Sequence, residues 1–178
     1  MNAALRARIL TALLLAALVI LVLVWLPPEV AVAMIAVAIF AGGYEWAGFA
    51  QLQSVPARLA YAAAILLVLT GAEMLAADPR WLRDILRLAA VWWLLAFVWL
   101  ALRAQAGGRL AAAVVGFLVL VPAGIGLSHL VTLQPHGQLL LLFLLVLIAA
   151  ADVGAYFGGR TFGRRKLAPH VSPGKTWE

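Results

Sequence analysis

The sequence has no cysteine and few charged residues. Without cysteine there is no disulfide framework, no thiolate metal site and no cysteine nucleophile. For the same reason the sequence does not indicate the redox compartment of the protein. Only 11% of the 178 residues are charged, against about 25% in ordinary soluble domains, whereas 66% are hydrophobic. These proportions exclude an ordinary soluble globular domain and predict an integral membrane protein.

The net charge of the protein is +6. A positive net charge of this size can indicate a protein that binds nucleic acid. Here, however, the basic residues lie between apolar stretches, where they orient helices and contact anionic lipid. We therefore expect membrane lipid, and no nucleic acid, among the partners.

Long apolar runs separated by polar links predict six membrane-spanning helices, since about 18 apolar residues can cross a hydrocarbon core. The first run could instead be a signal peptide, but its apolar core exceeds the usual length of about 7–15 residues and another span follows at once. We predict an all-α, polytopic membrane protein that forms one helical unit. The predicted spans are residues 9–26, 30–49, 59–77, 85–102, 110–131 and 139–157, followed by a basic loop over 158–178.

The distribution of basic residues predicts the orientation. Six spans place both chain ends on one side of the membrane. Three of the 13 basic residues fall on the other side, namely Arg80, Arg83 and Arg87. Ten fall on the side of the ends: Arg6, Arg8, Arg58, Arg103, Arg109, Arg160, Arg164, Arg165, Lys166 and Lys175. Because Lys and Arg accumulate on the cytoplasmic side, we expect both ends and the loop to be cytoplasmic.

Asp152 is an acid in the sixth apolar run, about one turn inside the predicted membrane edge. A carboxylate there costs several kcal/mol unless it is paired, hydrated or bound to a cation, so a functional role is the first hypothesis. The alternative is hydration at the interface or an ion pair with Arg160. Elsewhere, Glu73 lies near the end of the third span, and the separation of His129 and His136 near the opposite face predicts no metal site.

The terminal loop gathers side chains that bind phosphate oxygens. Lys166, Ser172, Lys175 and Thr176 offer two ammonium groups and two hydroxyls within a short stretch. The end of the nucleotide-binding motif G-x-x-x-x-G-K-[ST] is present, but Pro169 replaces its first glycine and no strand is predicted before it. A true P-loop is therefore excluded, whereas phosphate binding is still predicted.

The neighbouring arginines, Arg160, Arg164 and Arg165, are equally well explained as an anchor to anionic lipid. That explanation does not account for the segment SPGKT.

Several glycines predict close approach of the backbone. Gly154 and Gly158 favour close packing of the sixth span, as Gly124 does in the fifth. Gly159 and Gly163 are compatible with two interpretations, close packing or an approach of backbone N–H groups to a phosphate.

The run from Asp152 to Trp177, D-x-G-A-Y-x-x-G-R-x-F-G-x-x-K-L-A-P-x-V-S-P-G-K-T-W, closely resembles the middle segment of the bacterial phosphatidate cytidylyltransferase (CDP-diacylglycerol synthase) family. A looser similarity includes the opening R-x-R-I-L-T-A-L, the double proline after the first span, and the pair Glu45 and Trp46. The resemblance covers most of the chain, but only its last segment is specific.

This resemblance implies a Mg²⁺-dependent enzyme of the bacterial inner membrane in which phosphatidate attacks the α-phosphorus of CTP. It implies catalytic roles for Asp152, which would organise the metal or water, and for Lys175. Substrate binding would then fall to Lys175 with Ser172 and Thr176 on the CTP phosphates, to Lys166 in support, and to Arg160, Arg164 and Arg165 on the phosphatidate head group. A homodimer is also implied.

The sequence departs from the family pattern at its end. Family members continue into a signature with Lys-Asp, His-Gly-Gly and Asp-Arg elements, which supplies their main metal-binding aspartates and is missing here. We therefore expect an N-terminal fragment that is inactive alone. Two alternatives are a non-catalytic scaffold that binds phosphatidate, and a small ion or proton transporter subunit that uses Asp152.

Overall fold

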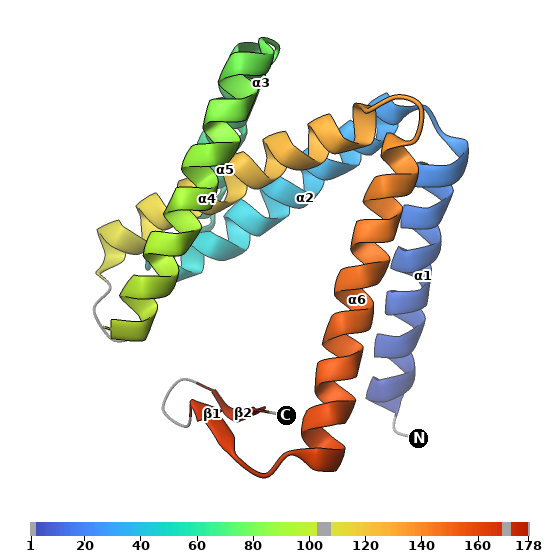
Figure 1. Cartoon of the computed structure of the whole chain (residues 1–178). Coiled ribbons are helices and arrows are strands. Elements are labelled where there is room, and N and C mark those ends of the chain that lie inside the picture. The colour runs from blue at the N-terminus through green and yellow to red at the C-terminus, as the bar shows by residue number, and fades with distance from the viewer. Residues whose placement is uncertain (1–2, 103–107, 169–171, 178) are drawn as a thin grey trace.

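The computed structural model describes residues 3–102, 108–168 and 172–177, and this part of the chain folds into helices with one small hairpin (Figure 1). The helices are α1 (Ala3–Trp25), α2 (Pro28–Phe49), α3 (Val55–Ala76), α4 (Pro79–Leu102), α5 (Arg109–Thr132) and α6 (Gly137–Phe162). The antiparallel strands β1 (Lys166–Ala168) and β2 (Ser172–Thr176) follow. The predicted all-α class is confirmed, and each predicted span corresponds to one helix.

Within the described residues, five helices, α2 to α6, are long and apolar enough to cross a membrane. The apolar part of α1 that can be assessed, Leu10–Trp25, is shorter, so its role as a sixth span stays a prediction. Large apolar side chains such as Leu13, Phe97 and Phe143 lie on the outer surface of the helices. Lipid can solvate such a surface and water cannot, so the protein is a multi-pass membrane protein.

Prolines and a serine cap mark where helices begin. Pro28 stands in the first turn of α2 and Pro79 opens α4, where a missing N–H costs nothing. Ser54 precedes α3, and its hydroxyl accepts a hydrogen bond of 3.4 Å from the backbone N–H of Ala57.

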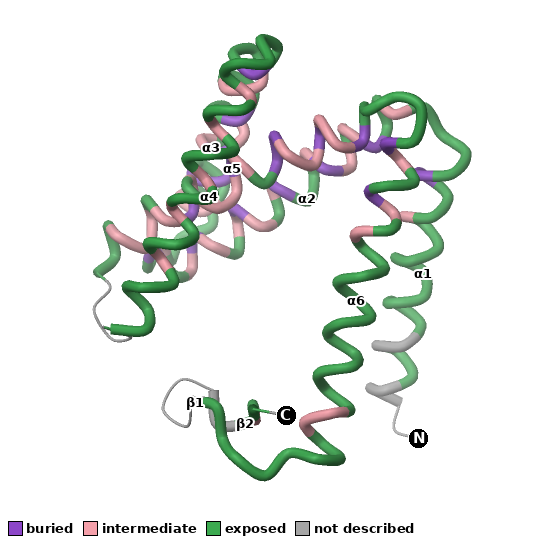
Figure 2. The backbone as a smooth tube through the Cα atoms, viewed as in Figure 1, coloured by how far each residue is buried: buried purple, intermediate pink, exposed green. Residues whose placement is uncertain are grey.

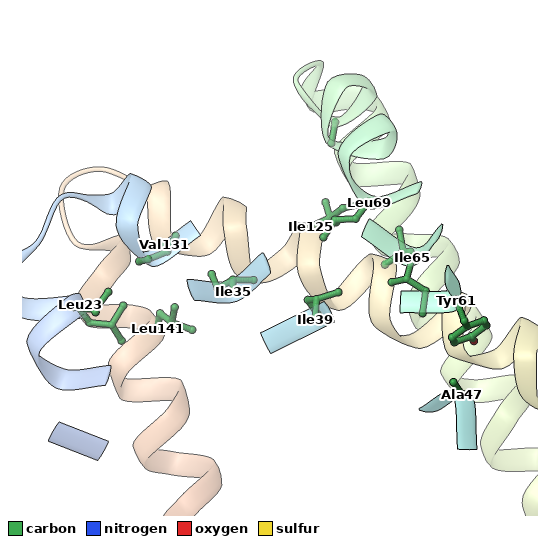
Figure 3. Close-up of a cluster of buried hydrophobic side chains, with 14 residues drawn as sticks. Leu23, Ile35, Ile39, Ala47, Tyr61, Ile65, Leu69, Ile125, Val131 and Leu141 are labelled. Atoms are coloured by element: carbon green, nitrogen blue, oxygen red, sulfur yellow. The ribbon is translucent and has the colours of Figure 1, made fainter. Parts of the chain in front are cut away.

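The packed centre of the molecule is formed by α2, α3 and α5. Buried residues recur every fourth position along α2, at Ile35, Ile39, Gly43 and Ala47, so one stripe of this helix faces its neighbours. Figure 3 shows Ile39 of α2 close to Ile65 and Leu69 of α3 and to Ile125 of α5.

Gly116 lets three helices meet at one point. The indole Nε1 of Trp46 on α2 donates to the carbonyl of Ala112 at 2.8 Å, and the hydroxyl of Tyr61 on α3 donates to the carbonyl of Ala113 at 2.6 Å. Both acceptors belong to α5. A Cβ atom at position 116 would overlap the Tyr61 hydroxyl and lie 2.7 Å from the Trp46 ring, so a side chain is excluded here.

A second unit, made of α1 and α6 side by side, joins the bundle at one end only (Figure 1). At the junction, Leu23 of α1, Val131 of α5 and Leu141 of α6 are almost fully buried and lie together (Figure 3). The amide Nε2 of Gln138 donates to the carbonyl of Leu26 at 2.7 Å and ties the end of α1 to the start of α6. Beyond its first turns α6 is largely exposed, and α4 contains no buried residue in the described chain (Figure 2).

The prediction that residues 158–178 form a loop is wrong in two respects. First, α6 continues to Phe162, five residues beyond the predicted end at 157. Second, the residues after it form the β1–β2 hairpin, with Lys166 opposite Thr176 and Ala168 opposite Ser172. Each glycine in a helix costs about 1 kcal/mol relative to alanine, which favoured an earlier end. In the structure, Thr176 of the hairpin lies 3.3 Å from the Cβ position of Gly159, a contact that helix propensity does not include.

Candidate functional site

The β1–β2 hairpin lies beside the last turns of α6 (Figure 1), and the two border an open cavity of about 820 Å³. From α6, Asp152, Tyr156 and Arg160 line it, because residues four apart share one face of a helix. From the end of the hairpin, Lys175 and Thr176 line the opposite wall. Four of the residues predicted for the site, Asp152, Arg160, Lys175 and Thr176, are therefore brought together.

Two glycines allow the hairpin to lie directly on the helix. A Cβ atom at Gly159 would lie 3.3 Å from Thr176 Oγ1, and one at Gly163 would lie 2.8 Å from the same side chain. These distances agree with close packing of the pair, and Gly159 also lines the cavity, so an approach of its N–H to a phosphate stays a prediction. At Gly154 no described atom lies within 4 Å of the Cβ position on this exposed part of α6, so the predicted packing stays a prediction there.

The cavity is bordered by two cations and one anion. Arg160 Nη1 donates to the hydroxyl of Tyr156 at 2.9 Å, which holds the guanidinium along the helix surface. Among the described residues, no ion pair involves Asp152, so the alternative pairing of Asp152 with Arg160 does not form. With Lys175 on the facing wall, the balance of charge favours an anionic ligand.

The hydroxyl of Thr176 is the second feature that indicates a ligand. Its Oγ1 is buried and has no hydrogen-bond partner in the described part of the chain. A buried polar atom without a partner costs about 1–3 kcal/mol. A phosphate oxygen in the neighbouring cavity would accept the hydroxyl hydrogen and remove this cost.

The other predicted residues lie around this cavity rather than in its described wall. Lys166 is paired with Thr176 across the hairpin. Arg164 borders a separate hollow of about 350 Å³ beside Phe162 and Gly163.

Arg165 immediately precedes β1, and its carbonyl accepts a hydrogen bond of 3.0 Å from the N–H of Trp177. Ser172 lies on β2, and its side chain is outside the described part of the structure. Neither observation assigns a substrate contact to these two residues.

The predicted site omitted two aromatic residues. Tyr156 and Trp177 both line the cavity, and their side chains are exposed. Tyr156 could have been found from the spacing, since it is four residues from both Asp152 and Arg160. Trp177 is placed by the hairpin, which the sequence did not predict.

Asp152 is the single carboxylate in the described wall of the cavity. The described residues contain no group of three or more His, Cys, Asp or Glu residues that could hold a metal ion. Mg²⁺ in phosphate-transfer sites is commonly held by one or two carboxylates, water and the substrate phosphates. A single carboxylate such as Asp152 suits a Mg²⁺ ion whose other ligands are water and the substrate phosphates. It does not suit an ion that is coordinated by protein side chains alone.

Comparison with known proteins places this chain in a family. The profile of the cytidylyltransferase family matches residues 6–178. A phosphatidate cytidylyltransferase of Pseudomonas aeruginosa is 40% identical over 141 residues, which cover 77% of this chain and 51% of that protein. The chain thus spans about half the length of this relative.

Shorter stretches match other proteins. A phosphatidate cytidylyltransferase of Haemophilus influenzae is 67% identical over 43 residues, 24% of this chain and 15% of that protein. An uncharacterized protein of Escherichia coli, YnbB, is 55% identical over 42 residues, 24% of this chain and 14% of that protein. No solved structure matches the chain. Because the family profile extends over nearly the whole sequence, the chain belongs to the cytidylyltransferase family.

Proposed function

We propose that this chain forms the phosphate-binding side of a membrane enzyme that converts phosphatidate and CTP into CDP-diacylglycerol and pyrophosphate. The observation that carries the proposal is the cavity in which Asp152, Arg160, Lys175 and Thr176 meet. The names of the relatives from Pseudomonas and Haemophilus support the choice of substrates.

In the proposed reaction, a phosphate oxygen of phosphatidate forms a bond to the α-phosphorus of CTP. The bond from that phosphorus to the oxygen of the β-phosphate breaks, and pyrophosphate leaves. Lys175 and Thr176 hold the CTP phosphates, with Ser172 and Lys166 nearby on the hairpin. Catalysis of this kind depends on position and on neutralised charge, which cations facing the phosphates provide.

The remaining groups receive roles by their place around the cavity. Arg160, Arg164 and Arg165 attract the phosphatidate head group, because guanidinium groups pair with phosphate in two-point contacts. A bound Mg²⁺ would neutralise charge on the transferred phosphates, and Asp152 would hold it. Trp177 offers an aromatic face on which a cytosine ring can stack.

The proposed substrates also set the location. CTP is a cytosolic nucleotide, so the hairpin and both ends of the chain lie on the cytoplasmic side of the bacterial inner membrane, as the basic residues predict. A homodimer remains a prediction, which the mass of the detergent-solubilised particle tests.

The first test is CTP binding by the chain in lipid nanodiscs, measured by equilibrium binding of labelled CTP with Mg²⁺. Lys175→Ala should raise the Kd by about tenfold or more, since a hydrogen bond to a charged group contributes about 1.5–3 kcal/mol. Lys175→Arg should retain part of the affinity. Arg83→Ala is the matched control, because Arg83 is an exposed cation on α4.

The alternatives give different results. In the same nanodiscs, a non-catalytic scaffold would bind phosphatidate in preference to phosphatidylcholine and show no CTP binding. After reconstitution in sealed liposomes, a transporter subunit would show an ion flux that Asp152→Asn abolishes. Transfer itself is measured as labelled CDP-diacylglycerol formed from CTP and phosphatidate. Unchanged CTP affinity in Lys175→Ala would remove the assigned role of Lys175.

A further inference from the structure

A second cavity, of about 400 Å³, lies at the opposite end of α6 from the hairpin. It is formed by α2, by α3 with the residue that follows it, and by the last turns of α5, the helix that precedes α6 in the chain. Asp152 lies 15 residues beyond Gly137, which is about 22 Å further along α6 at 1.5 Å per residue. The two cavities are therefore separate sites.

A carboxylate and an imidazole face each other in this cavity. Glu73 Oε2 lies 3.5 Å from His129 Nδ1, with 29% and 30% of the two side chains exposed. The same Nδ1 lies 3.1 Å from the carbonyl oxygen of Ile125. A carbonyl only accepts, so the contact with Ile125 is a hydrogen bond when Nδ1 carries the hydrogen, and the Glu73 carboxylate then lies beside this N–H.

The other oxygen of Glu73 has no partner. Glu73 Oε1 is buried and makes no hydrogen bond within the described residues. A carboxylate in a membrane helix costs several kcal/mol unless a donor or a cation compensates it. The apolar part of the wall, which includes Leu69, offers no such group.

The polar neighbours add acceptors to the cavity. The Thr132 hydroxyl donates to the carbonyl of Ser128 at 3.0 Å or of His129 at 3.1 Å, and the Thr70 hydroxyl donates to the carbonyl of Leu67 at 2.9 Å. Since each hydroxyl hydrogen is used on the backbone, these oxygens present lone pairs. Thr70 and Thr132 both line the cavity with Glu73, so oxygen acceptors outnumber donors there.

We propose that this cavity binds a compact monovalent cation, an alkali ion or a primary ammonium group, held by Glu73 Oε1 and the lining hydroxyls. Glu73 is the single carboxylate in the described wall, so one positive charge balances it. Divalent ions are usually held by more carboxylate ligands than this wall offers. His129 is a positioning residue, since its contact with Oε2 holds the carboxylate and leaves Oε1 without a described partner.

The ammonium source could be a lipid head group or a free ion, and the test separates them. The chain is purified in dodecyl maltoside at pH 8, and its thermal unfolding midpoint is measured against rising potassium, sodium, ammonium or N-methylglucamine chloride at constant ionic strength. A ligand that binds the folded state raises the midpoint in a saturable way. If a free ion is the ligand, a small cation stabilises the chain and the bulky N-methylglucamine does not. If a lipid amine is the ligand, added phosphatidylethanolamine stabilises it and phosphatidylcholine does not.

Glu73→Gln should raise the apparent Kd by about tenfold or more, because the charge-assisted contact is lost. Asp84→Asn is the matched control, since it removes one exposed carboxylate on α4 without touching the cavity. If Glu73→Gln fails to fold, Thr132→Val keeps the shape and should weaken binding severalfold. Equilibrium binding of radioactive rubidium to the unaltered chain gives an independent measurement. Equal responses of Glu73→Gln and the unaltered chain, or no response to any small cation or amine, would overturn the proposal.

Discussion

The contact at Gly116 gives the sharpest prediction on stability. In Gly116→Ala, the new methyl group would meet the Tyr61 hydroxyl and lie 2.7 Å from Trp46 Cδ1 and 2.9 Å from Nε1. Both side chains must then move away from the carbonyls of Ala112 and Ala113, which they now contact at 2.8 and 2.6 Å.

The expected magnitude combines three effects. Two lost hydrogen bonds cost about 1 kcal/mol each. Overpacking adds about 1–3 kcal/mol. The higher helix propensity of alanine relative to glycine raises the free energy of unfolding by about 1 kcal/mol. We therefore expect Gly116→Ala to lower the free energy of unfolding by about 2–4 kcal/mol.

The assay is unfolding by sodium dodecyl sulfate in mixed micelles, followed by tryptophan fluorescence. Gly71→Ala is the matched control, because it also lies in a helix and no described atom is within 4 Å of its Cβ position. This control should be neutral or stabilising by up to about 1 kcal/mol. Tyr61→Phe should reduce the cost of Gly116→Ala, because it removes the overlapping oxygen. Equal stability of Gly116→Ala and Gly71→Ala would refute the three-helix contact.

Three further predictions concern the hairpin and the link before α3. Gly163→Ala, whose Cβ would overlap the Gly159 carbonyl and lie 2.8 Å from Thr176, should weaken CTP binding severalfold in the nanodisc assay, whereas Gly154→Ala should leave it unchanged. Thr176→Val removes a buried hydroxyl without a described partner, so it should leave the unfolding midpoint unchanged or raise it. The same substitution should weaken CTP binding by about threefold to tenfold. An unchanged affinity for CTP would contradict a role of this hydroxyl in binding. Arg58→Leu loses the 2.9 Å bond from Nε to the Leu52 carbonyl and the contact with the Tyr44 ring, and should lower stability by about 1–2 kcal/mol in the mixed-micelle assay, with Arg83→Leu as its control.

The helices could be predicted from sequence because their signal is local. An apolar run long enough to cross a bilayer can satisfy its backbone only as a helix, and prolines such as Pro28 and Pro79 fix where helices begin. The shared face of Asp152 and Arg160 also follows from spacing along one helix.

The rest depends on contacts between distant segments. The helix continues through Gly158 and Gly159 because Thr176 packs against it, and helix propensity alone predicts an earlier end. Glu73 and His129 lie in different predicted spans, and nothing local indicates that α3 and α5 bring them to 3.5 Å. The orientation of the site in the membrane, its metal and its substrates stay predictions.

Because the α1–α6 unit contacts the bundle at one end only, a small rotation at that end moves the opposite end of α6 by a large distance. A helix of 26 residues is about 39 Å long, so a rotation of about 10° where it leaves the bundle displaces its far end by about 7 Å. That displacement exceeds the tolerance of any phosphate contact. If Lys175 holds a nucleotide as we propose, its placement depends partly on the packing of Leu23, Val131 and Leu141 at the other end of the helix. A cavity-forming substitution at this junction would then displace the proposed binding residues without removing any of them.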